Sequence, residues 1–278
     1  ARTAVSIMGL EDKETKDNSN KANLRKVMRI FAKTPVALSA FYRTRKGKKI
    51  IPPKSNLSFS ENFFHMCFGK VPNKEIVKAF DVSLILYAEH SFNVSTFTAR
   101  TITSSLSDIH GAITGAIASL KGPLHGGANE EVMHMMNKIK KPENALKWIN
   151  KALDNKDVVM GFGHRVYKSG DSRVPTMREY FGKVAKIKKD KKFEKIYDIV
   201  EKVMIDRKNI HPNVDYPTGP TYHLMGFDTD FFTPIFVISR ITGWSAHIIE
   251  QHAANKLIRP LASYKGSKHR KVLQLNQR

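Results

Sequence analysis

Apolar side chains in this chain recur at the three- and four-residue spacing of a helix face, and this periodicity is the strongest constraint on its fold. The clearest case is segment 231–255, whose apolar positions are Ile235, Phe236, Ile238, Ile241, Trp244, Ile248 and Ile249. Segment 75–89 has the same character after a turn at Pro72. The alternation of apolar and polar residues that is typical of strands is scarce. The sequence therefore predicts an all-α protein.

Three further helical segments are expected. Segment 99–120 is rich in Ala, Gly and Ser, which suits one helix packed closely against its neighbours. Pro142 opens a short amphipathic helix, because proline is favoured in the first helical turn. Segment 175–203 keeps a helical period, with Gly182 and the lysine-rich residues 188–192 as two places where it could be interrupted.

The composition fits a globular protein with a sizeable core. The chain has 278 residues, of which 41% are hydrophobic, and this length predicts one large domain or two smaller ones. The single cysteine, Cys67, excludes an internal disulfide and favours a reducing compartment. No apolar run approaches the ~18 residues of a membrane helix, so we expect a soluble protein.

Residues 1–6 resemble helix interior without an N-cap, and we expect that the natural start, with any targeting peptide, is missing.

The formal net charge of +22 raises an alternative, because many nucleic-acid-binding proteins are strongly basic. However, the lysines are dispersed, with local runs at 43–49 and 186–195. They are not accompanied by RNP, zinc-finger or helix-turn-helix signatures. A lysine-rich solvated surface that attracts small polyanions is the favoured interpretation, and nucleic-acid binding is kept as a remote alternative.

Two glycine-rich stretches and one acidic residue indicate acid–base chemistry. His125 lies among glycines in segment 121–130, and His164 lies among glycines in segment 160–167. At such turns an imidazole can face a ligand that approaches close to the backbone. Asp215, in the Pro-rich and turn-like segment 212–215, adds a candidate base.

Other kinds of site are not supported. Gly161 and Gly163 could suggest a dinucleotide-binding loop, but His164 and Val166 follow where that fingerprint needs a further glycine. Zinc-binding spacing such as His-Glu-x-x-His does not occur, and the lone cysteine has no support as a nucleophile. Most of the other histidines are expected to be ordinary surface or core residues; they are His65, His110, His134, His211, His223, His247, His252 and His269.

Taken together, His125, His164 and Asp215 resemble the catalytic set of the citrate synthase family, and further motifs agree in order from the N-terminal residues 2–6 to residues 258–260. The resemblance implies a helical homodimer in which a large and a small domain close over a cleft that holds the active site. The small domain is then expected at 128–220, between large-domain segments 1–127 and 221–278. The N-terminal part of the large domain is expected to be missing.

The resemblance also implies a reaction, in which an acyl coenzyme A and oxaloacetate condense and the thioester is hydrolysed. His125 matches the histidine that hydrogen-bonds the thioester carbonyl, and its place before a helix start at Ala128 favours a neutral imidazole. Asp215 matches the base that removes the proton α to the thioester. His164 matches the histidine that polarises and protonates the ketone of oxaloacetate.

Binding residues are implied in the same way, without a metal or other cofactor. The positions that match oxaloacetate-binding residues are His90, Arg173, Arg240 and Arg259. In the family the last of these reaches into the neighbouring subunit's site, which implies a dimer. The positions that match the coenzyme A-binding loop are Val159, Met160, Gly161, Phe162 and Gly163, with Asn213 nearby.

The acyl donor is predicted from segments whose sequence differs from the form common in citrate synthases. Segment 87–90 reads Tyr-Ala-Glu-His in place of the His-Ala-Asp-His form common in citrate synthases, and it looks like 2-methylcitrate synthases, as do segments 170–177 and 217–220. Propanoyl coenzyme A is therefore favoured, with acetyl coenzyme A also accepted, because one methylene is usually discriminated by only ~1–3 kcal/mol. A dedicated citrate synthase is the alternative. The expected location is the cytoplasm, or the mitochondrial matrix in a eukaryote.

Overall fold

The computed structural model describes residues 1–164, 166–167, 169–267 and 270–278. Arg165 of the second glycine-rich motif and His269 therefore lie outside the described residues. The helices are α1 (Arg2–Glu11), α2 (Asn20–Thr44), α3 (Phe59–Phe68), α4 (Lys74–Tyr87), α5 (Val94–Ser104), α6 (Ile109–Leu120), α7 (Ala128–Ile139), α8 (Pro142–Asp154), α9 (Val174–Lys188), α10 (Lys192–Lys208), α11 (Asp215–Met225), η1 (Thr229–Phe231), α12 (Phe232–Ala253) and η2 (Leu275–Gln277). Within these ranges no strand forms, and Phe162 and Pro212 make one isolated bridge. The predicted all-α class is confirmed.

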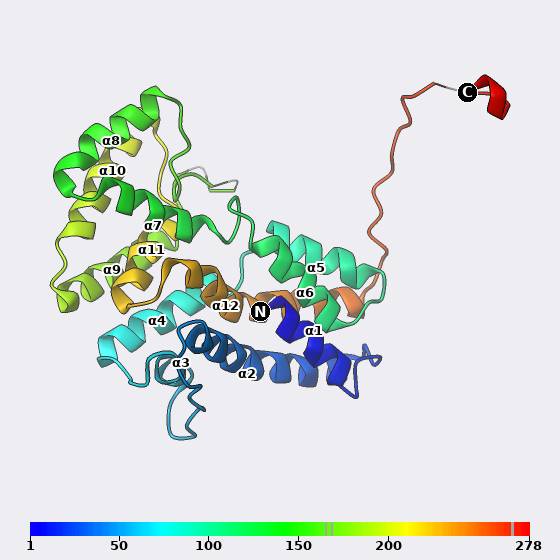
Figure 1. Ribbon diagram of the computed structural model, residues 1–278, viewed down its shortest axis with the longest axis horizontal. Helices are drawn as coiled ribbons and strands as arrows, with labels where there is room; N and C mark the ends of the chain where they lie inside the picture. The colour runs from blue at the N-terminus through cyan, green and yellow to red at the C-terminus, as the bar shows by residue number, and fades with distance from the viewer. Residues whose placement is uncertain (165, 168, 268–269) are drawn as a thin grey trace.

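The helices form two groups joined by α12 (Figure 1). Helices α7 to α11 gather at one end of the molecule, and α1, α5 and α6 lie at the other. Helix α12 packs against α2, α4, α5, α6 and α7, so it contacts both groups. The chain beyond α12 leaves this body and ends apart from it. No described helix is long and apolar enough to cross a membrane.

Two hydrophobic clusters hold the helices together. The larger cluster is rich in stacked and tilted aromatic rings, including Phe63, Phe80 and Phe227, and it continues through the buried faces of α7 to α11. The smaller cluster surrounds the fully buried Trp244 of α12 and takes in α5 and α6. Since the larger cluster includes residues from each of the segments 1–127, 128–220 and 221–278, that division into domains stays a prediction.

Several expected helices are confirmed with small changes of boundary. Segment 231–255 forms α12 and segment 75–89 forms α4. Pro142 is the first residue of α8, at the position that proline favours. Helix α1 begins at Arg2 without a side-chain cap, as its sequence suggested.

The single helix expected at 99–120 is wrong. Two helices, α5 and α6, occupy this region, and the chain turns between them at Leu106, whose φ is 65°. Asp108 then starts α6 as an N-cap, because its carboxylate accepts a hydrogen bond from the N–H of Gly111 at 2.9 Å. A residue with a short polar side chain favours this cap over the helix interior, and the Ala-rich composition concealed it.

The lysine-rich residues 188–192 do interrupt segment 175–203, as expected. Helix α9 ends at Lys188, Lys189 adopts a left-handed conformation with a φ of 54°, and α10 begins at Lys192. Gly182, the other candidate, lies inside α9 and does not interrupt it.

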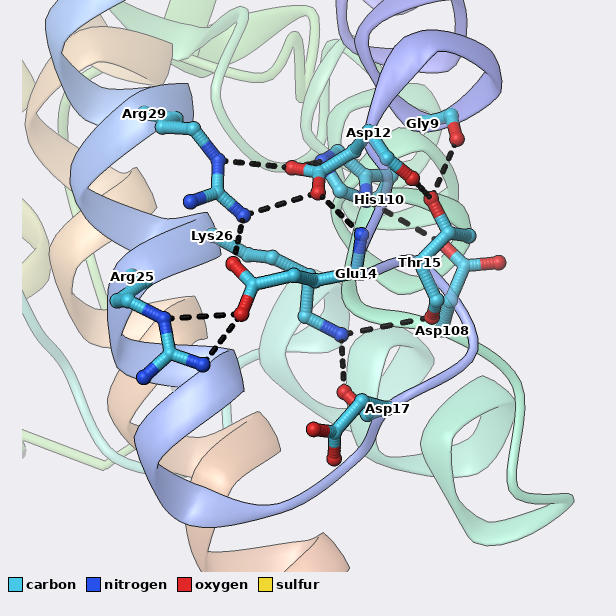
Figure 2. A network of polar contacts seen from close by, with 10 residues as sticks. All are labelled: Gly9, Asp12, Glu14, Thr15, Asp17, Arg25, Lys26, Arg29, Asp108 and His110. Carbon is cyan, nitrogen blue, oxygen red and sulfur yellow. Dashed lines mark hydrogen bonds and ion pairs between the residues drawn. The ribbon is translucent and has the colours of Figure 1, made fainter.

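A polar network fixes the connection between α1 and α2 (Figure 2). Lys26 is fully buried, and its ammonium group donates to the backbone oxygens of Thr15 and Asp17 at 3.4 and 2.6 Å. Arg29 donates to both oxygens of Asp12 at 2.9 Å and to Glu14 at 2.7 Å. These contacts hold the loop against α2.

Candidate active site

The expected catalytic residues lie around one pocket between the two groups of helices. Its volume is about 440 Å³, within the range of ligand sites. The residues that line it are Tyr87, His90, Ser91, Phe92, Asn93, Val94, Leu124, His125, Ala128, Gly163, His164, Val166, Arg173, Asn213, Val214, Asp215, Phe236 and Arg240. They come from the end of α4, the loop 90–93 and the start of α5, the turn before α7 and its first residue, the loops before α9 and α11, the start of α11, and α12.

The glycine-rich turn before α7 positions His125. The N–H of His125 donates to Gly122 O at 2.9 Å, and the N–H of Gly126 donates to Leu120 O at 2.9 Å. A Cβ on Gly126 would lie 2.6 Å from that same carbonyl oxygen. This position therefore requires glycine for a close backbone approach.

The ring of His125 is oriented by Ser95, near the start of α5. Its Nε2 lies 2.7 Å from Ser95 Oγ, and the backbone N–H of Ser95 donates to the same nitrogen at 3.4 Å. Because a backbone N–H can only donate, the tautomer that fits carries its proton on Nδ1. Trp244 donates to Ser95 Oγ at 3.0 Å. Burial lowers the pKa of His125 to about 4, aided by the positive charge of Arg240, so the imidazole is a neutral donor.

Asp215 is the first residue of α11, a correction to the turn-like context expected from its sequence. The hydroxyl of Tyr87, at the end of α4, donates to Asp215 Oδ1 at 2.5 Å. Burial raises the pKa of Asp215 to about 6, against the opposing effects of the Tyr87 hydrogen bond and the Arg173 charge. A carboxylate of this kind is a stronger base than an ordinary aspartate and is still ionised at neutral pH.

Backbone pairing brings His164 to the same pocket. The N–H of Gly163 donates to His211 O at 2.9 Å, and the N–H of Asn213 donates to Gly161 O at 2.9 Å. These bonds join two sequence motifs that lie some fifty positions apart. His164 Nδ1 accepts the N–H groups of Val166 and Tyr167 at 3.1 and 3.2 Å.

The proton of neutral His164 is therefore on Nε2, which remains available to a ligand. The ring stacks on that of His90, with centroids 4.9 Å apart. Burial is the main cause that lowers the pKa of both imidazoles, to about 4 for His90.

Two arginines supply positive charge. Arg240 of α12 is 2% exposed, and its Nε donates to Tyr87 O at 2.7 Å. Burial, with the charge of nearby Arg173, lowers the pKa of Arg240 to about 10, so it stays a cation at neutral pH. Arg173 precedes α9 and pairs with Asp171 at 2.7 Å. Two guanidinium groups beside one pocket are suited to a dicarboxylate.

The structure thus brings together eight of the residues predicted for the site: His90, His125, Gly163, His164, Arg173, Asn213, Asp215 and Arg240. The remaining residues of the expected coenzyme A loop do not line the pocket. Val159 and Gly161 are buried, Met160 packs beside the larger hydrophobic cluster, and the Phe162 ring lies 4.4 Å from that of Tyr216. Arg259 lies beyond α12, exposed and outside this pocket.

Sequence reasoning missed two residues that support the site. Ser95 contacts His125, and its only sequence signal is its place two residues after Asn93, the N-cap of α5. Asp171 lies in segment 170–177, but it was not predicted to be a partner of Arg173. Among the described residues, no group of three or more His, Cys, Asp or Glu side chains is arranged to hold a metal ion.

Comparison with known proteins identifies the family of this chain. The family described as "Citrate synthase, C-terminal domain" matches residues 1–261. A citrate synthase of Mycolicibacterium smegmatis is 51% identical over 98% of this chain and 72% of its own length. A 2-methylcitrate synthase of Mycobacterium tuberculosis is 52% identical over 97% of this chain and 68% of its own length.

A solved structure gives the same result for the fold. The citrate synthase of Thermoplasma acidophilum, in a ternary complex with carboxymethyl coenzyme A and oxaloacetate, aligns with a TM-score of 0.89 and 33% identity. The alignment covers 100% of this chain and 74% of that one. The fold and the matches define a helical acyltransferase. Within that class, the chain belongs to the citrate synthase family.

Proposed function

We propose that this protein condenses propanoyl coenzyme A with oxaloacetate and water to give 2-methylcitrate and coenzyme A, and that it also accepts acetyl coenzyme A to give citrate. The observation that carries the proposal is the convergence of His125, His164 and Asp215 on one pocket beside two arginines. Membership in the citrate synthase family supports the reaction class.

In the first step Asp215 removes a proton from the carbon α to the thioester. Its raised pKa suits this work, but a thioester is a weak carbon acid, and the enolate needs a donor at its oxygen. His125 supplies that donor through Nδ1–H, since its Nε2 faces Ser95. One such preorganised donor is worth ~3–4 kcal/mol to a transition state.

In the second step the α carbon attacks the ketone of oxaloacetate. A new carbon–carbon bond forms, and the ketone oxygen takes the proton of His164 Nε2 to become a hydroxyl. Arg173 and Arg240 bind the carboxylates and hold the ketone beside His164. The proton that Asp215 took from the α carbon replaces the one that His164 gave up, which restores both residues. Water then cleaves the thioester, which leaves a new carboxylate, free coenzyme A and one released proton. The proposed steps use no metal and no cofactor, since acyl coenzyme A is a substrate.

The remaining predicted residues are assigned to coenzyme A and to a dimer. Gly163 and Asn213 line the pocket, and the adjoining Val159, Met160, Gly161 and Phe162 are proposed to complete the coenzyme A loop through their backbone. Arg259 is proposed to complete the oxaloacetate site of the neighbouring subunit in a homodimer. We place the enzyme in the cytoplasm, or in the mitochondrial matrix of a eukaryote, because a single cysteine, Cys67, favours a reducing compartment.

A dedicated citrate synthase that uses acetyl coenzyme A is the second candidate. It is favoured by the 51% identity to a protein of that name. The 2-methylcitrate assignment rests instead on segments 87–90, 170–177 and 217–220. Of their residues, Tyr87 lines the pocket and donates a hydrogen bond to the base. The two functions differ only in the size of the acyl group.

The test is to mix purified protein with oxaloacetate and either acyl coenzyme A and to follow the release of free thiol. We expect turnover with both donors and a higher kcat/KM for propanoyl coenzyme A. Asp215→Asn and His125→Ala should each reduce kcat by at least about a hundredfold with the fold intact. Well-folded variants with near-normal rates would remove Asp215 and His125 from the mechanism, and a preference for acetyl coenzyme A would select the second candidate.

A further inference from the structure

Asp171 is a buried acidic residue behind the pocket rather than in its lining. Its side chain has no exposed surface, and the mechanism above gives it no role. Taking an ionised carboxylate out of water is costly unless it is paired and hydrogen-bonded. The contacts of Asp171 therefore indicate what this carboxylate does.

Asp171 accepts four hydrogen bonds from two helix starts. Its Oδ1 accepts from the backbone N–H of Arg173 at 3.0 Å and from Arg173 Nε at 2.9 Å. Its Oδ2 accepts from Arg173 Nη2 at 2.7 Å and from the N–H of Val214 at 3.1 Å. Arg173 is the N-cap of α9, and Val214 is the N-cap of α11. A carboxylate between two helix N-termini is stabilised by both dipoles.

These contacts fix two groups of the proposed mechanism. The bidentate pair occupies one edge of the Arg173 guanidinium, so its orientation is set and the remaining N–H groups are directed elsewhere. Arg173 Nη1 makes only a long contact to Leu86 O, at 3.4 Å. The bond to Val214 fixes the residue directly before Asp215.

We propose that Asp171 is a positioning residue that holds both the oxaloacetate-binding Arg173 and the base Asp215 in their reactive places. The inference rests on the proposed function, because Arg173 and Asp215 have these roles only in that reaction. Asp171 does not touch substrate. It acts through the two residues that do.

The charge of Asp171 also affects the base. The charged and titratable groups that face Asp215 are Tyr87 of α4, Arg240 of α12, and Asp171 and Arg173 before α9. Of these, Asp171 alone raises the pKa of Asp215, while Tyr87 and the two arginines lower it. Asp171→Asn removes that charge and frees Arg173 to pair with Asp215, and both changes stabilise the ionised base.

The experiment compares Asp171→Asn with Asp198→Asn, which makes the same change at an exposed residue paired with Arg178. For Asp171→Asn we expect a raised KM for oxaloacetate and a fall in kcat/KM of about ten- to a hundredfold, as is typical of misplaced catalytic groups. The acid limb of its kcat/KM–pH profile should move to lower pH. Asp198→Asn should match the wild type in all three measurements.

A second variant separates charge from geometry. Asp171→Glu keeps the negative charge, so its acid limb should stay at the wild-type pH, while its longer side chain still lowers kcat/KM. A pH profile that does not move in Asp171→Asn, or an unchanged KM for oxaloacetate, would overturn the proposal. Failure of both variants to fold would assign Asp171 to folding and would overturn it as well.

The outcomes remain distinct from those of the proposed function. If wild-type protein releases no thiol from either acyl coenzyme A, the proposed function fails first. If wild-type protein is active and Asp171→Asn is folded and unchanged, the positioning role alone fails.

Discussion

Two opposing influences set the pKa of the base Asp215: burial raises it, and the hydrogen bond from Tyr87 lowers it. Tyr87→Phe removes the hydroxyl and leaves the ring packed against Phe236, 4.1 Å away. The ionised carboxylate then loses a donor, so the pKa of Asp215 should rise. We expect the acid limb of the kcat/KM–pH profile to move up by roughly one pH unit, the scale of one hydrogen bond to a charged group.

The direction of this shift is the critical measurement. Tyr87→Phe and Asp171→Asn should move the acid limb in opposite directions, because one removes a group that lowers the pKa of Asp215 and the other removes a group that raises it. Two shifts of the same sign would indicate that the limb reports a general loss of structure rather than titration of this base.

Sequence reasoning located the site residues whose neighbours in the sequence are unusual. His125 and His164 stand among glycines, and the structure gives a reason for this, since a Cβ on Gly126 would collide with Leu120 O. Ser95 and Asp171 carry no comparable signal. The contact of Ser95 with His125 and the bond from Val214 to Asp171 form only when the chain folds, because they join residues 30 and 43 positions apart. Such long-range contacts are not encoded in local spacing, whereas the pair of Asp171 and Arg173 is local.

At the scale of the helices, the contact between α7 and α11 depends on a small residue. A Cβ on Gly219 of α11 would lie 2.8 Å from the backbone oxygen of Asn129 in α7. Gly219→Ala must therefore push the two helices apart, and we expect it to cost ~1–3 kcal/mol as overpacking does. Thermal unfolding should show a lower Tm. Because both helices border the pocket, kcat should fall as well.

Gly182 of α9 provides the matched control. A Cβ there would meet Arg178 and Glu194 at 3.5 and 3.6 Å, which is ordinary contact. Alanine is favoured over glycine inside a helix by ~0.5–1 kcal/mol, so Gly182→Ala should raise the Tm and leave the kinetics unchanged. Equal losses of stability in both variants would contradict this account of the α7–α11 contact.

A helix could be predicted from the sequence where a single local signal, such as apolar periodicity or a proline in the first turn, was clear. Apolar periodicity found α4 and α12, and Pro142 marked α8. Periodicity failed at 105–108, where the helix-forming composition continues on both sides and the N-cap Asp108 decides the break. The lysine-rich break after Lys188 was one of two interruptions that the sequence suggested, and like charges close together on a helix oppose its continuation.

At the scale of the whole molecule, a single chain leaves the proposed oxaloacetate site without Arg259. This residue follows α12 on an exposed stretch, whereas Arg173 and Arg240 line the pocket. In the proposed homodimer Arg259 enters the neighbour's site. A site would then combine Asp215 of one subunit with Arg259 of the other, and a mixture of two inactive variants can test this.

Asp215→Asn and Arg259→Ala should each be inactive as homodimers. In a mixed dimer one site carries both substitutions and the other carries neither, so that second site should work. Random pairing makes about half of the dimers mixed, with one of two sites intact, which predicts about a quarter of wild-type activity after co-expression. As a control, Asp215→Asn combined with Arg173→Ala should recover nothing, because those two residues line the same pocket of one chain. If Arg259 instead served its own chain, the first pair would also stay inactive, since each site would then keep one substitution.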